Sequence, residues 1–362
     1  MKSKLYVLIP VIQVLYILFT SYFFITETND SRSYYGIASQ LPKISESLFP
    51  IFYPFLLRIA SFICGSYFVT SKIINVICIL SFFLITKKYI EEWKILWLFS
   101  LSWFFFSILS NSWSEAVLIP LMTAIFVLQR KFWNTKGENN IYIIYHTLLL
   151  FLLFITKYSM VYMIIGTFLF GALMYIYTKQ RKFLFFIYSA FFSIILALLY
   201  LYANYQLTGY FTGNRAALGD LNINLRLSLF NTLQAVNPFF GNIYGRTPFF
   251  VVIIIFIILS VIYINRIFTI WREKKTENLY FIFVGLFYLF FLWASYFYTK
   301  IDILNIRLLF PFCFLFFLGL IANNLETKKI KFYKYLIIFM YTLQILISLN
   351  NILSHNNYYL SH

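Results

Sequence analysis

The feature that most restricts how this chain can fold is a series of long apolar segments that recur along its whole length. The first of them, residues 5–25, contains no charged residue. About 20 apolar residues are enough for a helix to cross the hydrocarbon core of a bilayer. Only 11% of the chain is charged and 62% is hydrophobic, whereas soluble domains carry roughly 25% charged residues. The sequence therefore predicts an integral membrane protein.

The apolar segments are continuous and do not alternate with polar residues, so they favour transmembrane helices over the strands of a barrel. We expect an all-α fold, a polytopic helical bundle that forms one integral-membrane domain over residues 1–362. Residues 5–25 are too long and too aromatic for a secretory signal and lack a small-residue cleavage site before Glu27. About eleven transmembrane helices are predicted, near residues 5–25, 66–86, 95–110, 114–129, 141–156, 159–178, 183–203, 249–265, 279–297, 308–323 and 333–349.

The formal net charge of +17 comes mainly from basic runs that lie between the apolar segments. Such runs are typical of cytoplasmic loops, because Lys and Arg are enriched on that side of membrane proteins. They do not indicate nucleic-acid binding. With the N-terminus inside, most Lys and Arg residues fall inside and the C-terminus lies outside. The runs occupy residues 87–94, 129–136, 179–182, 265–275 and 327–334.

Two predicted outer segments, residues 26–65 and 204–248, are long enough to build a site. The first contains a proline-bounded apolar piece, residues 49–62, that is too short and too close to the next span to cross a membrane by itself. We expect this piece to lie along the membrane surface as an amphipathic helix. The other predicted outer connections are short turns, and any chemistry is expected on this outer face.

The acidic residues divide into two sets in this predicted membrane topology, an inner set and an outer set. Those in the predicted inner loops share their loops with Lys or Arg, which is typical of solvated surface charge. A general base for a reaction on the outer face has to come from the other set. That outer set consists of Glu27, Asp30, Glu46, Glu115, Asp220 and Asp302.

Asp30 is the first candidate base, because it follows the first span by a few residues and precedes a tyrosine pair in DSRSYYGIA. A structural role is also open for it, since an Asp before a first helical turn can cap the free N–H groups of that helix. Glu27 is a secondary acidic candidate, and it also fits an interfacial charge that closes the first span.

Glu115 and Asp302 are further secondary candidates with structural alternatives of their own. Ser112 lies three residues before Glu115 in NSWSEAVLIPL, the spacing of a helix capping box. Asp302 has Lys300 and Arg307 nearby in the sequence. A surface ion pair with either cation would contribute little stability.

Arginines in the predicted outer segments are unusual, because the inside bias of positive charge disfavours them there. Some of them fit interfacial anchors with an apolar stem and a charged tip. A group of them beside apolar surface also fits a site for a lipid-linked phosphate, since guanidinium groups bind phosphate oxygens in bidentate fashion. The outer arginines are Arg32, Arg58, Arg215, Arg226, Arg246 and Arg307.

Four parts of the chain carry a family pattern, in order. They are ETNDSRSYYGIA with the following FPIFYPFLLRIASFICGSYFVTSKIINVICILSFFL, then NSWSEAVLIPLMTAIFVL, then ANYQLTGYFTGNRAALGDLNINLRLSL, and last TKIDILNIRLLFPFCFLF. Together they resemble the GT-C superfamily of integral-membrane glycosyltransferases, including its family 39-like, mannosyltransferase-like members. The matching patterns are the acid after the first span, Ser-x-Glu at the fourth span, Asn-Tyr before Leu-Thr-Gly, and Asp followed by Arg-x-x-Phe-Pro.

This resemblance implies a GT-C fold and an enzyme that transfers a sugar from a polyprenyl-phosphate-linked donor on the outer face. The acceptor is expected to be a glycan, a lipid or another envelope molecule, and the bilayer is the other partner. By resemblance, Asp30 takes the place of the catalytic base and Arg307 that of a donor-phosphate ligand. Further donor-phosphate candidates are Arg215, Arg226 and Arg32.

No metal or cofactor is expected. Cys64, Cys78 and Cys313 lie in apolar surroundings without a Cys-x-x-Cys spacing, which supports neither disulfides nor a metal cluster. The sequence departs from the resembling family in two ways. It lacks the paired Asp-Glu of the protein mannosyltransferases, so a protein acceptor is not implied, and it lacks an Asp-x-Asp pair in the first outer segment.

Two alternative functions stay open at this point. A polymerase of O-antigen or capsule would rely on arginines in large outer loops. A lipid-linked sugar flippase or transporter would show internal repeats and polar residues within the membrane. Lys72 and Lys157 are the candidates for charges within a span, and both also fit positions near the outer edge.

For localisation, a multi-pass protein of a bacterial inner membrane is expected, with the active face outside the cytoplasm. The endoplasmic reticulum is the alternative. There, the glycosylation sequence of residues 29–31 would attach a bulky glycan beside Asp30.

Overall fold

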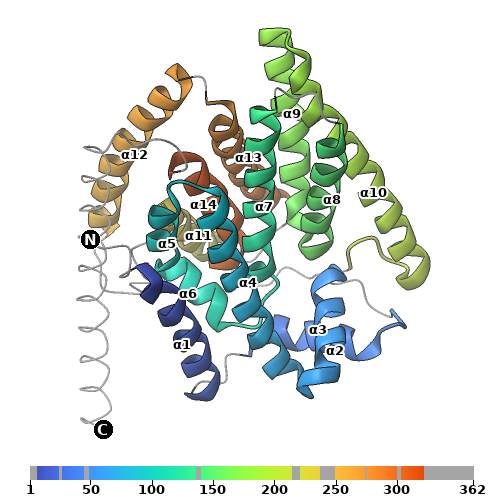
Figure 1. The fold of residues 1–362 in the computed structure, drawn as a ribbon. Coiled ribbons are helices and arrows are strands. Elements are labelled where there is room, and N and C mark those ends of the chain that lie inside the picture. Colours follow the sequence, from blue (N-terminus) through green and yellow to red (C-terminus); the bar gives the residue numbers. More distant parts are fainter. Residues whose placement is uncertain are drawn as a thin grey trace.

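The structure, a computed structural model, contains helices and no strands in the residues it describes, which confirms the predicted all-α class (Figure 1). It describes residues 6–23, 27–44, 49–135, 140–213, 221–236, 249–273, 275–299 and 303–321. The helices are α1 (Leu8–Phe23), α2 (Asn29–Gln40), α3 (Phe52–Cys64), α4 (Tyr67–Tyr89), α5 (Trp93–Ser100), α6 (Trp103–Ser110), α7 (Glu115–Asn134), α8 (Ile141–Thr156), η2 (Tyr158–Met160), α9 (Val161–Thr178), η3 (Arg181–Phe183), α10 (Leu184–Thr208), α11 (Leu221–Val236), α12 (Phe249–Arg272), α13 (Thr276–Thr299) and α14 (Ile306–Ile321).

Five helices in the described part are long and apolar enough to cross a bilayer, and a bent pair adds a sixth. The helices α1, α8 and α14 are apolar but shorter, with 16 residues each. The predicted span at 333–349 lies outside the described residues. The structure thus supports several membrane-crossing helices, and the full count of eleven stays a prediction. The five long helical stretches are Tyr67–Tyr89, Glu115–Asn134, Tyr158–Thr178, Arg181–Thr208 and Thr276–Phe297.

The helix predicted at 95–110 is not continuous, although its two parts together are long and apolar enough for one broken span. The chain forms two short helices there, α5 and α6, bent by 64° relative to each other. Ser102 has an extended conformation (φ −66°, ψ 154°) and starts α6, while the hydroxyl of Ser100 donates to the carbonyl of Trp97 at 2.7 Å. Serine side chains compete with helical backbone hydrogen bonds in this way. The carbonyl of Ser100 accepts a hydrogen bond from Gln13 Nε2 in α1 at 2.6 Å, which stabilises the break.

A helix, α3, is present where the sequence predicts the surface helix. One side of it packs against α2 and α4, and Tyr53 is fully buried there within a small second core that joins these helices to the start of α7. The other side exposes apolar side chains, with Phe62 77% exposed. Gly65, with a φ of 78°, permits the turn from α3 to α4. The exposed apolar residues of α3 are Phe55, Ile59, Phe62 and Ile63.

The second predicted outer segment contains a helix, α11, that was not predicted. Its leucines and isoleucine alternate with polar residues in LNINLRLSL. A period of two is typical of a strand, so this pattern does not indicate a helix. Contacts with α14 and α12 hold α11 in place. In the Leu-Thr-Gly sequence, α10 ends at Thr208 and Gly209 adopts a φ of 76°.

The helix ends that the predicted topology places outside lie together at one end of the bundle. α2 and α3 lie at the lower end in Figure 1, near the start of α7 and the end of α8. Within the bundle, α7 packs against α4, α6, α8, α13 and α14. A central helix with this many neighbours places its first residue where several other helices begin or end.

Candidate functional site

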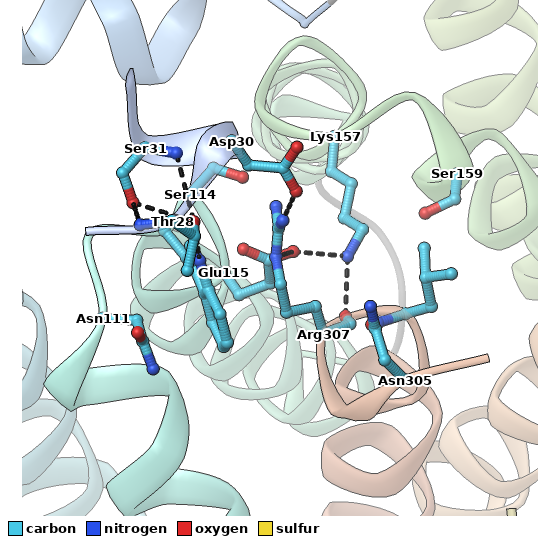
Figure 2. A network of polar contacts seen from close by, with 12 residues as sticks. Thr28, Asp30, Ser31, Asn111, Ser114, Glu115, Lys157, Ser159, Asn305 and Arg307 are labelled. Atoms are coloured by element: carbon cyan, nitrogen blue, oxygen red, sulfur yellow. Dashed lines mark hydrogen bonds and ion pairs between the residues drawn. The ribbon is translucent and has the colours of Figure 1, made fainter. Parts of the chain in front are cut away.

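Four charged side chains from four helix ends meet at this end of the bundle (Figure 2). We call Asp30, Glu115, Lys157 and Arg307 the charged cluster. Arg307 Nη1 forms an ion pair with Asp30 Oδ2, and Arg307 Nε lies 3.1 Å from Glu115 Oε1. The same Glu115 oxygen lies 2.7 Å from Lys157 Nζ. Two carboxylates and two cations therefore balance each other in charge.

The members of the charged cluster differ strongly in burial. The side chain of Glu115 is 0% exposed, and those of Lys157 and Arg307 are 11% and 12% exposed. The side chain of Asp30 is 38% exposed. Glu115 is thus the most deeply buried member of the cluster, and Asp30 is the member most exposed to solvent.

The guanidinium of Arg307 is held on several sides. Its three nitrogens reach Glu115, Asp30 and the hydroxyl of Tyr34, the last at 3.4 Å from Nη2. Its flat face lies 4.8 Å from the ring centroid of Trp113, a cation–π contact that stabilises the cation. The hydroxyl of Tyr34 also pairs with Ser114 Oγ at 2.9 Å. Arg307 is consequently fixed in one orientation.

The interpretation of Asp30 as a helix cap is wrong. Thr28 is the N-cap of α2, and it forms a capping box with Ser31, each side chain accepting from the other's backbone N–H at 3.2 Å. The indole N–H of Trp113 donates to Thr28 Oγ1 at 3.0 Å and ties this turn to the start of α7. Because Thr28 and Ser31 satisfy the helix end, the carboxylate of Asp30 is available for Arg307.

The predicted capping box of Ser112 and Glu115 is also wrong. Ser112 Oγ pairs with Ser71 Oγ of α4 at 2.6 Å, and the N-cap of α7 is Ser114, whose side chain makes no capping hydrogen bond. Glu115 is the first residue of α7, where the helix dipole favours a negative charge. Its side chain points toward Lys157 and Arg307 (Figure 2).

Polar side chains of α4 hold the turn that carries Glu115. Asn75 Nδ2 donates to the carbonyls of Leu109 and Asn111, both at 2.8 Å. Lys72 Nζ donates to the carbonyl of Ser110 at 2.5 Å. These carbonyls lie at the C-terminal end of α6, where a cation interacts favourably with the helix dipole. Lys72 therefore has a structural partner near the helix end and is not an isolated charge within a span.

Replacing Asn75 by Leu is expected to lower the free energy of unfolding by about 1–3 kcal/mol, because buried carbonyls lose their donor. Thermal unfolding of the protein in lipid nanodiscs measures the change. The matched control is Ile77→Ala on the exposed side of the same helix, where surface substitutions change stability by about 0.5 kcal/mol or less. Equal unfolding temperatures for the two variants would contradict the role given to Asn75.

The start of α14, which carries Arg307, is held by the unpredicted helix α11. The backbone N–H of Leu304 donates to Ser228 Oγ at 2.9 Å, and the carbonyl of Leu304 accepts from Asn231 Nδ2 at 3.0 Å. Asn305 Oδ1 accepts from the N–H of Leu308 at 3.2 Å. Lys157 Nζ donates to the carbonyl of Arg307 at 2.7 Å and thereby joins the end of α8 to the start of α14.

The other predicted site residues do not join the charged cluster in the described part of the chain. Glu27 is half-buried, and Arg32 and Arg226 are exposed. Arg215 and Asp302 lie outside the described residues. In the described ranges, no three His, Cys, Asp or Glu side chains gather as metal ligands would.

Sequence reasoning missed three partners of Arg307. Lys157 appeared only as a possible charge within a span, although a lone lysine between two apolar segments was a usable signal. Tyr34 and Trp113 gave no such signal, because many aromatic residues of this chain lie in equally apolar surroundings. Their roles depend on contacts between distant segments.

Comparisons with protein-family models, curated proteins and solved structures found no match to this chain. The functional assignment therefore rests on the charged cluster and on the patterns in the sequence.

Proposed function

We propose that this chain is a GT-C-like glycosyltransferase that moves a sugar from a polyprenyl-phosphate donor to a glycan, lipid or other envelope acceptor. The charged cluster is its active site. The observation that carries the proposal is the ion pair between Asp30 and Arg307. The sequence resemblance gives these two residues, far apart in the chain, the roles of base and phosphate ligand in one reaction.

The cluster has the electrostatic character of an anion site. Arg307 and Lys157 supply two cations within contact of one carboxylate oxygen. The N-termini of α2, α7 and α14 also converge here, through Asp30, Glu115 and Arg307. Helix N-termini carry positive partial charge and bind phosphate groups. The two carboxylates compensate this positive charge when no anion is bound.

In the proposed reaction, a hydroxyl of the acceptor attacks the anomeric carbon of the donor sugar. Asp30 accepts the hydroxyl proton, a new carbon–oxygen bond forms, and the bond between the anomeric carbon and the phosphate oxygen breaks. Polyprenyl phosphate leaves with the bonding electron pair, and Arg307 and Lys157 stabilise its charge. Asp30 suits the role of base because it is the most exposed member of the cluster.

The membrane arrangement belongs to the same proposal. The apolar helices cross the membrane about eleven times, and the charged cluster lies on the extracytoplasmic face. The exposed apolar side of α3 lies in the membrane surface, as an amphipathic helix does. It forms one wall of the path by which the lipid tail of the donor reaches Arg307.

Mass analysis of envelope glycans and glycolipids tests this function. Cells with and without the gene are compared, and the deleted strain is complemented with the wild-type protein. We expect one glycan or glycolipid to lose a single sugar in the deleted strain and to regain it on complementation. Identical profiles in all strains would contradict a role in sugar transfer to envelope molecules.

The orientation gives a separate prediction. In a Cys64→Ser background, a cysteine at Ser39, exposed on α2, is expected to react with a membrane-impermeant maleimide in intact cells. A cysteine at Thr135, exposed at the far end of α7, is expected to react only after the membrane is opened. The reverse pattern would place the charged cluster in the cytoplasm and would exclude a donor on the outer face.

A further inference from the structure

The side chain of Asp30 occupies the place on Arg307 that a phosphate ligand needs. We propose that a phosphate group and Asp30 compete for Arg307, so that binding of the phosphate releases the Asp30 carboxylate. The inference deepens the proposed function and rests on it for the identity of the ligand, a polyprenyl phosphate. In this proposal, Arg307 keeps the Asp30 carboxylate paired until a phosphate binds.

The contacts of Arg307 show why an exchange is needed. Each of its three nitrogens already has a protein partner, and the ring of Trp113 covers a face of the guanidinium. These contacts use three of the five N–H groups of the guanidinium, and Asp30 holds the one on the exposed side of the cluster. A phosphate that binds this exposed edge in bidentate fashion therefore requires one partner to move away. The free energy of that displacement is smallest for the partner that water can solvate best.

Burial identifies that partner as Asp30. Glu115 is fully buried, and Tyr34 is 2% exposed. Moving Glu115 away from Arg307 would break a buried ion pair, which is strongly disfavoured. Asp30 is more than one-third exposed, so water can solvate its carboxylate after release. Arg307 is largely buried, so the exposed carboxylate is the half of this ion pair that can move away.

The rest of the cluster keeps its shape during the exchange. Glu115 Oε1 retains both Arg307 Nε and Lys157 Nζ. The two cations therefore stay side by side while Nη1 changes its partner from carboxylate to phosphate. Glu115 acts here as a positioning residue.

Release of Asp30 connects donor binding to catalysis. A guanidinium that donates a charge-assisted hydrogen bond to a carboxylate stabilises the ionised form, which makes the carboxylate a weaker acceptor for a substrate proton. After the exchange the carboxylate is free and lies beside the bound donor. The base becomes available when the sugar phosphate is in place, and otherwise it stays paired.

Equilibrium binding of undecaprenyl monophosphate to the full-length protein in nanodiscs tests the exchange. Undecaprenol, which lacks the phosphate, is the reference ligand. Asp30→Asn removes the internal competitor, and we expect it to bind the phosphate at least about 1.5- to 5-fold more tightly than the wild type. That range corresponds to an exposed ion pair, and this pair has one largely buried partner. Glu27→Gln is the matched control, because it makes the same charge change nearby without a contact to Arg307 in the described structure. We expect its affinity to equal that of the wild type.

The outcomes separate this inference from the proposed function. Wild-type protein that prefers the phosphate over undecaprenol, with Asp30→Asn binding equally or more weakly, would overturn the exchange and leave the phosphate site standing. An equal gain in Glu27→Gln would also overturn it, because general electrostatics would then explain the effect. Wild-type protein without any preference for the phosphate would contradict the proposed function itself.

Discussion

Replacing Asp30 by Asn is expected to lower the turnover number for sugar transfer by about 10²–10⁴-fold, the usual contribution of a general base. An amide is similar in size to a carboxylate but cannot accept the proton of the acceptor hydroxyl. The start of α2 should be unaffected, because Thr28 and Ser31 form the capping box there. The measurement is the rate at which purified protein in nanodiscs glycosylates its acceptor from the polyprenyl-phosphate sugar identified in the strain comparison.

Two further observations make this prediction specific. Glu27→Gln is expected to keep the wild-type turnover number, because Glu27 lies outside the charged cluster. Asp30→Asn should lose turnover while it binds undecaprenyl monophosphate more tightly, and a misfolded protein would not gain affinity. Near-normal turnover in Asp30→Asn would remove Asp30 from the role of base.

Replacing Glu115 by Ala is expected to lower the free energy of unfolding by about 3–5 kcal/mol, the effect of breaking a buried ion pair from one side. The carboxylate is fully buried and is shared by Lys157 and Arg307. Its removal leaves two largely buried cations that repel each other, with Asp30 as the remaining counter-ion at the open edge. Unfolding of the ligand-free protein in nanodiscs, followed with temperature or denaturant, measures the loss.

A double variant checks the physical reason for this loss. Glu115→Ala combined with Lys157→Met removes one uncompensated cation together with the carboxylate, and we expect it to be more stable than Glu115→Ala alone. Arg226→Ala, an exposed arginine on α11, should change stability by about 0.5 kcal/mol or less. A loss below about 1 kcal/mol in Glu115→Ala would show that Glu115 does not anchor the cluster.

Much of the fold class follows from the distribution of apolar residues. Long uncharged segments must satisfy their own backbone hydrogen bonds in a bilayer, so they form helices. The same physics draws attention to charges at the ends of such segments, because a charge in the apolar core is costly. Asp30, Glu115 and Arg307 were candidates for this reason, and the structure places all three in one cluster.

Other features needed contacts that local pattern does not encode. The break between α5 and α6 depends on Gln13, which binds the carbonyl of Ser100 from another helix. Helix α11 depends on its packing against α14 and α12, since its own sequence alternates in the manner of a strand. The predicted cap at Asp30 is wrong because Thr28 caps α2 instead. The predicted cap at Ser112 is wrong because the hydroxyl of Ser112 pairs with that of Ser71.

The sequence by itself determined that the chain is helical, that its apolar helices suit a membrane, and which acidic and basic residues lie near the outer helix ends. These properties depend on hydrophobicity and backbone hydrogen bonding, which act over one segment at a time. The tertiary structure alone decided that Arg307 holds Asp30 rather than a neighbour in sequence, and that Glu115 and Lys157 complete the cluster. Pairing of charges depends on which helix ends meet in space and on how deeply each side chain is buried there.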